Sequence, residues 1–122
     1  MQLVKGIFLM LSLFAFTNTI SAQDAVISNV NVTEFKKMMS DENVVILDVR
    51  TPKEVAQGAV PNAQNINVFE NFTANISKLD KSKTYLVYCR SGRRSANAAN
   101  QMANAGFTKI YNLLGGYNAY RR

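Results

Sequence analysis

The stretch Thr84-Tyr85-Leu86-Val87-Tyr88-Cys89-Arg90-Ser91-Gly92-Arg93-Arg94-Ser95 decides how this chain folds. Residues 84–88 form a short run of β-branched, aliphatic and aromatic residues, which predicts a buried strand. The Ala-rich run at 96–105 ends before Gly106, which predicts a helix closed by a glycine. Between the strand and the helix lies a tight loop, with the chain's only cysteine at its start and three arginines inside it.

A loop between a strand and a helix N-terminus is suited to holding an anion. The first helical turn leaves backbone N–H groups unpaired, and the helix dipole adds partial positive charge. A thiol there is biased toward the thiolate, which is the nucleophilic form. We therefore predict that Cys89 is a nucleophile. Arg90, Arg93 and Arg94 are expected to add positive charge if their side chains turn inward, and Gly92 allows the backbone a positive φ.

Strands and helices alternate along the rest of the chain. The patterns predict strands at 25–28, 44–49, 63–68, 84–88 and 107–111, and helices at 32–40, 53–57, 69–79, 96–105 and 117–122. Residues 44–49 are apolar except for Asp48, which is typical of a parallel strand buried on both faces. The order predicts one α/β domain with a mostly parallel central sheet and helices on both faces.

Three segments resemble the rhodanese (sulfurtransferase) family. The first is the loop Cys89-Arg90-Ser91-Gly92-Arg93-Arg94-Ser95. The second is Asp48-Val49-Arg50 with Glu54, followed by Gly58-Ala59-Val60-Pro61-Asn62-Ala63 and Ile66-Asn67-Val68. The third is Leu114-Gly115-Gly116 with Ala119-Tyr120. Together they extend over roughly residues 28–120, so the resemblance implies a rhodanese-like three-layer fold for nearly the whole domain.

The chain departs from the family pattern at four positions. Ala59 stands where the family usually has histidine, Asn62 where it has glycine, Val68 where it has proline, and Tyr120 where it has tryptophan. Asparagine tolerates the left-handed conformation, so the turn at Asn62 is expected to survive.

The resemblance also implies an activity and a site. Cys89 would take a sulfane sulfur from a small anionic donor such as thiosulfate, carry it as a persulfide, and pass it to a thiol or cyanide-like acceptor. Asp48 and Arg50 are expected to support the site as a structural ion pair. No metal or organic cofactor is implied. The residues expected to bind the substrate are Arg90, Ser91, Gly92, Arg93, Arg94 and Ser95.

Two other functions remain open. A cysteine phosphatase also surrounds an anion with a cysteine and an arginine, but it needs C-x5-R, whereas Cys89 to Arg94 is C-x4-R. Tyr88 also precedes the cysteine where such enzymes have histidine. The other alternative is a non-catalytic exported module that binds sulfur or a partner protein. The substitution at Ala59 and the short C-terminus favour that reading, whereas the intact loop argues against it.

Residues 1–22 are typical of a secretory signal peptide. Lys5 supplies the positive start, residues 6–16 are apolar, and residues 17–22 are small or polar, which predicts cleavage after Ala22. An uncleaved anchor is the alternative, although the apolar run is shorter than the roughly 20 residues that span a bilayer. We therefore expect a mature rhodanese-like domain at 23–122, periplasmic or secreted, without stable membrane insertion after cleavage.

Composition excludes several other classes of function. The chain has 122 residues, a formal net charge of +6, one cysteine and no histidine. Histidine-based acid–base catalysis and the common zinc sites are therefore excluded, and no internal disulfide can form. Outside the loop no basic run is longer than Lys36-Lys37 or Arg121-Arg122. Nucleic-acid binding is thus not expected, because a basic stripe interleaved with aromatic residues is missing.

Overall fold

A computed structural model describes residues 25–122. The strands are β1 (Val26–Val30), β2 (Val44–Asp48), β3 (Gln64–Asn65), β4 (Thr84–Tyr88) and β5 (Lys109–Leu113). The helices are α2 (Val32–Met38), α3 (Pro52–Ala56), α4 (Phe72–Ile76), α5 (Arg93–Asn104) and α6 (Gly116–Tyr120).

The signal-peptide prediction for residues 1–22 lies outside the described residues. Within residues 25–122, no helix is long and apolar enough to cross a membrane.

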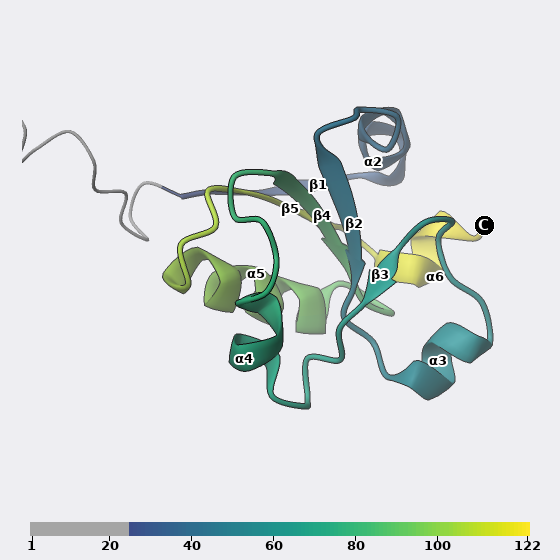
Figure 1. The fold of residues 1–122 in the computed structure, drawn as a ribbon. Coiled ribbons are helices and arrows are strands. Elements are labelled where there is room, and N and C mark those ends of the chain that lie inside the picture. Colours follow the sequence, from purple (N-terminus) through teal and green to yellow (C-terminus); the bar gives the residue numbers. More distant parts are fainter. Residues whose placement is uncertain (1–24) are drawn as a thin grey trace, which may run out of the picture.

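The five strands form one parallel sheet in the order β1-β5-β4-β2-β3. Helices α4 and α5 lie on one face of this sheet, and α2 lies on the other (Figure 1). The short helix α6 packs on the same face as α2, because Tyr117 and Tyr120 join the cluster around Phe35. The predicted fold class, a parallel sheet covered on both faces, is confirmed.

The central strand β4 supplies side chains to the cores on both faces. Tyr85 and Val87 point to the α4–α5 side, whereas Leu86 and Tyr88 point to the α2–α6 side. This alternation follows from the two-residue period of a strand, and it explains why the run is apolar throughout. Small residues on α5 let the helix approach the sheet closely; they are Ala98, Ala99 and Ala103.

The observed bounds of several elements differ from the predicted ones, and for three of them the structure shows what marks the bound. Of the strand predicted at 63–68, only Gln64–Asn65 forms β3, although the Ile66 and Val68 amides still donate to the Asp48 and Val49 carbonyls. The Asn67 side chain accepts from the Phe69 amide, which starts a turn. The helix predicted at 69–79 is observed at Phe72–Ile76, and it begins only at Phe72 because Asn71 has a φ of 47° and interrupts the helical backbone. The last strand begins at Lys109 rather than at 107, since the Phe107 amide donates to Met102 at the end of α5.

The helix after the cysteine loop begins earlier than predicted. Helix α5 runs from Arg93 to Asn104, so Arg93, Arg94 and Ser95 lie in its first turn. Gly92 is the N-cap and has a φ of 105°, a conformation that residues with a Cβ rarely adopt. The loop between β4 and α5 is therefore only four residues long, from Cys89 to Gly92.

Candidate active site

The candidate site lies at the carboxyl edge of the sheet, where parallel α/β sheets place their ligands. Cys89 directly follows β4, and residues 49–51 follow the neighbouring strand β2. Cys89 has no exposed surface, so the loop shields its sulfur from bulk water. The sheet thus brings together the two segments that the sequence singled out, although 40 residues separate Asp48 from Tyr88.

Hydrogen-bond donors surround the sulfur of Cys89. The Gly92 amide donates to Sγ at 3.1 Å, and the Ser95 hydroxyl donates at 3.3 Å. Burial opposes ionisation of the thiol, but the hydroxyl and amide of Ser95 and the amides of Gly92 and Ser91 outweigh it, so the pKa of Cys89 is lowered. The loop therefore favours the thiolate. Ser95 binds the sulfur instead of capping the helix, and Ser91 is exposed.

The three loop arginines, expected to add positive charge at the sulfur if they turn inward, do not converge on one point. Arg94 donates from both of its terminal nitrogens to the two carboxylate oxygens of Glu54, each at 2.8 Å. Arg93 is exposed and lines a separate pocket with Phe69. Arg90 turns to a polar cavity on the α6 side. Arg94 also lines the pocket with Phe69, so Arg93 and Arg94 lie on one side of the loop and Arg90 on the other.

Glu54 connects helix α3 to the first turn of α5. Its carboxylate accepts from the Thr51 amide at 3.2 Å and from the Thr51 hydroxyl at 3.1 Å, and Thr51 caps α3 in return. The hydrogen bonds from Arg94 lower the pKa of Glu54 to about 2, against the opposing effect of burial. The pair is therefore ionised at any physiological pH. It fixes the position of Arg94 beside the cysteine loop.

Asp48 and Arg50 form a buried ion pair, the arrangement expected from the sequence. Arg50 Nη2 lies 2.6 Å from Asp48 Oδ2, and Arg50 Nη2 also donates to the Gly58 carbonyl at 2.8 Å. The Tyr88 hydroxyl donates to Asp48 and accepts from the Val60 amide. Burial, followed by the bond to Asp48, raises the pKa of Tyr88, so the phenol stays protonated. Together, the contacts of Asp48, Arg50 and Tyr88 connect β2 and β4 to the turn after α3.

Helix α6 supports the loop from the other side. The Tyr117 amide donates to the Cys89 carbonyl at 2.8 Å, and the Asn118 amide donates to the Arg90 carbonyl at 3.1 Å. Gly116 makes this approach possible, since a Cβ there would lie 2.5 Å from the Cys89 carbonyl oxygen. The backbone of the loop is therefore held by α6 while its amides face the sulfur.

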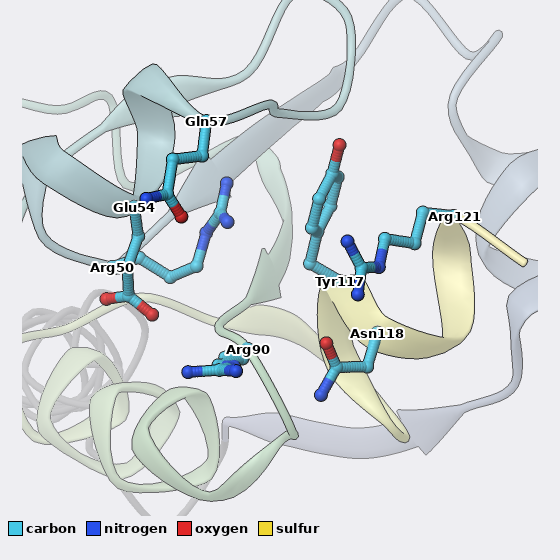
Figure 2. A pocket seen from close by; sticks show the side chains of 7 residues that line it. All are labelled: Arg50, Glu54, Gln57, Arg90, Tyr117, Asn118 and Arg121. Carbon is cyan, nitrogen blue, oxygen red and sulfur yellow. The ribbon is translucent and has the colours of Figure 1, made fainter.

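A polar cavity with a volume of about 100 Å³ lies between helices α6 and α3. Figure 2 shows α6 presenting side chains from one side, with the loop after β2 and helix α3 facing them and Arg90 entering from the cysteine loop. The residues that line the cavity are Arg50, Glu54, Gln57, Arg90, Tyr117, Asn118 and Arg121.

Comparison with known proteins decides the family. A family model described as a rhodanese-like domain matches residues 31–122. The chain belongs to the rhodanese-like family. It is 33% identical over 87 residues to a protein named sulfurtransferase from Allochromatium vinosum, covering 71% of this chain and 80% of that one. The family assignment made from the sequence is thus confirmed.

The fold agrees with solved rhodanese-like structures. A rhodanese-like domain protein from Staphylococcus aureus superposes with a TM-score of 0.69 at 30% identity, covering 76% of this chain and 90% of that one. The chain is also similar to part of a protein with a different name. A tRNA uridine(34) hydroxylase from Cytophaga hutchinsonii is 37% identical over 91 residues, which is 71% of this chain but only 29% of the hydroxylase.

Several residues of this rhodanese-like site carried no clear signal in the sequence. Asn112 is buried, and its side chain donates to the Gly92 carbonyl at 3.3 Å and to Asn29 at 3.1 Å, so it supports the loop from β5. An asparagine within the otherwise apolar run at 110–114 was the available hint. Tyr117 and Arg121 belong to none of the motifs found in the sequence, although both follow the glycine pair Gly115-Gly116.

Replacing Ser95 with alanine should raise the pKa of Cys89. The change removes one hydrogen bond to the sulfur, worth about 1 kcal/mol, which corresponds to a roughly fivefold lower rate of iodoacetamide alkylation at neutral pH. Because the thiolate predominates only above the pKa, the pH profile of alkylation should move to higher pH. Ser91→Ala is the matched control, since Ser91 acts on Cys89 through its amide. Identical profiles for both variants would contradict the role of the Ser95 hydroxyl.

Proposed function

We propose that this protein is a sulfurtransferase that carries a sulfane sulfur as a persulfide on Cys89. The observation that carries the proposal is the sulfur of Cys89 held by the Gly92 amide and the Ser95 hydroxyl, with its pKa lowered. An anionic sulfur in such a ring of donors is stabilised as an oxyanion is in an acyl-transfer enzyme. Similarity to a protein named sulfurtransferase supports the same conclusion.

The proposed reaction has two steps. The Cys89 thiolate attacks the outer sulfur of thiosulfate, the sulfur–sulfur bond of thiosulfate breaks, and sulfite leaves with the electron pair. This leaves a persulfide anion on Cys89. An acceptor thiol or cyanide then attacks the terminal sulfur, and the Cys89 thiolate is the leaving group. The total charge is unchanged in each step, and the reaction needs no external oxidant or reductant.

The surroundings of Cys89 suit a persulfide more than a phosphoryl intermediate. Arg94 is engaged by Glu54 through two hydrogen bonds, so it is not turned toward the sulfur as a phosphate-binding arginine would be. The buried sulfur is also protected from oxidation, which matters because low-pKa thiols are readily oxidised. A non-catalytic module would not need a thiol with a lowered pKa.

The proposal includes export from the cytoplasm. The charged start, apolar run and small-residue end of residues 1–22 support a cleaved signal peptide, and the domain would act in the periplasm or outside the cell. The donor would be a small sulfur anion and the acceptor a thiol or cyanide-like nucleophile. Nucleic-acid binding forms no part of the proposed activity.

Sulfite release from thiosulfate, with cyanide as acceptor, tests the function. We expect wild-type protein to turn over, and Arg94→Ala to lower kcat/KM by roughly tenfold, because the Arg94–Glu54 pair positions the start of α5 and Cys89 lies within electrostatic reach of Arg94. Lys109→Ala at the far end of β5 is the control and should stay near wild type. No sulfite from the wild type would overturn the function, while equal losses in both variants would refute the role of Arg94.

A further inference from the structure

The polar cavity beside the cysteine loop is separate from the sulfur itself. It is lined by the side chain of Arg90, whereas the residues around Sγ are Gly92 and Ser95. Two other lining residues, Tyr117 and Asn118, donate their backbone amides to the carbonyls of Cys89 and Arg90, so the cavity borders the cysteine loop. Cys89 itself is not among the lining residues, so a ligand in the cavity lies beside the loop and not on the sulfur.

The charges around the cavity favour an anion. Two of its charged residues are balanced by ion pairs: Arg50 by Asp48, and Glu54 by Arg94. Those are the two ion pairs among residues 25–122, so Arg90 and Arg121 contribute uncompensated positive charge within that part of the chain.

The other lining groups suit an oxyanion. The side-chain amides of Gln57 and Asn118 carry N–H donors, and both face the cavity together with Arg121 (Figure 2). With about 100 Å³ of space, the cavity has room for a small group such as a carboxylate. Guanidinium groups with amide donors beside them are the combination that binds carboxylates through several hydrogen bonds.

The position of the cavity indicates which reactant it serves. In thiosulfate the anionic group is one bond from the sulfur that Cys89 attacks, so that anion must lie at the sulfur. An anion in the cavity must instead be joined to its reacting sulfur by a longer linker. An organic thiol that carries a carboxylate several atoms from its sulfur has this property.

We propose that this cavity binds the carboxylate of the thiol that accepts sulfur from Cys89, with Arg90 and Arg121 as its charged contacts. The inference rests on the proposed function, because it names the acceptor class for the same site. Arg121 is the specificity residue of the pair, since it lies on α6, outside the cysteine loop.

The test compares ω-mercapto carboxylates of increasing chain length with ω-mercapto alcohols of the same length, with thiosulfate as donor. At one or more lengths the wild type should show a lower KM for the acid than for the alcohol. Arg121→Gln should raise the ratio of the acid KM to the alcohol KM by about fivefold, as expected for one charge-assisted contact at a partly exposed site. Arg122→Gln, the neighbouring exposed arginine outside the cavity lining, is the matched control and should leave the ratio unchanged.

A binding measurement separates this inference from the function. In Cys89→Ser protein, NMR titration with the preferred mercapto acid should shift the backbone amides of Asn118 and Arg121, and the mercapto alcohol should not. If these shifts occur while the wild type releases no sulfite, the sulfurtransferase proposal fails and the anion site stands. Equal KM ratios for wild type and Arg121→Gln, or equal effects of Arg121→Gln and Arg122→Gln, would overturn the acceptor subsite.

Discussion

Cys89→Ser is expected to abolish sulfur transfer, with sulfite release from thiosulfate falling by about a thousandfold or more. A serine hydroxyl remains protonated where the thiol ionises, so the ring of donors around position 89 no longer holds an anionic nucleophile. The chain has one cysteine, and therefore no other thiol can take over the sulfur.

The fold of this variant can be checked independently. Serine is close in size to cysteine, and the Gly92 amide and the Ser95 hydroxyl remain to hydrogen-bond to it. Thermal unfolding should therefore stay close to wild type. A folded Cys89→Ser protein that retained a tenth of wild-type sulfite release would contradict the assignment of Cys89 as nucleophile.

Gly116→Ala should destabilise the domain by about 3 kcal/mol or more, because it forces apart two backbone segments. A Cβ at this position would lie 2.5 Å from the Cys89 carbonyl oxygen and 2.6 Å from the Arg90 carbonyl carbon. Neither neighbour is a flexible side chain, so the loop or α6 must move. Urea unfolding gives the loss of stability, and alkylation of Cys89 shows whether the loop moved.

Gly106→Ala is the matched control for this prediction. Gly106 also has a positive φ, of 103°, but a Cβ there would meet only the flexible Lys81 side chain, with Cδ at 3.5 Å and Nζ at 3.9 Å. Its cost should therefore be the backbone strain alone, about 1–2 kcal/mol. If the two variants lost equal stability, contact between α6 and the cysteine loop would not be the reason for the glycine at position 116.

The sequence was sufficient for the fold class and for the position of the cysteine loop, because both depend on local patterns. Residues 84–88, and residues 44–49 apart from Asp48, carry apolar or aromatic side chains on both faces, and a parallel sheet covered by helices buries such strands completely. Cys89 and Gly92 lie within one short motif, so their proximity follows from the chain itself. The ends of helices and strands could not be predicted where a single residue determines them, as Asn71 does for the start of α4.

The partners of the loop arginines could not be predicted in the same way. Whether Arg94 turns to the sulfur or to Glu54 depends on how α3 docks against α5, across 40 residues of sequence. The contact between Tyr88 and Asp48 likewise depends on the register of β2 against β4. The cavity also depends on where α6 packs, and no motif indicates that Arg121 would line it together with Arg90.

Intact-protein mass spectrometry after thiosulfate treatment tests the central claim, a persulfide on Cys89, most directly. We expect the wild type to gain the mass of one sulfur atom and to lose it when cyanide is added, while Cys89→Ser, treated in parallel, gains nothing. A folded wild-type protein with a titratable thiol that gains no sulfur would contradict the sulfurtransferase account.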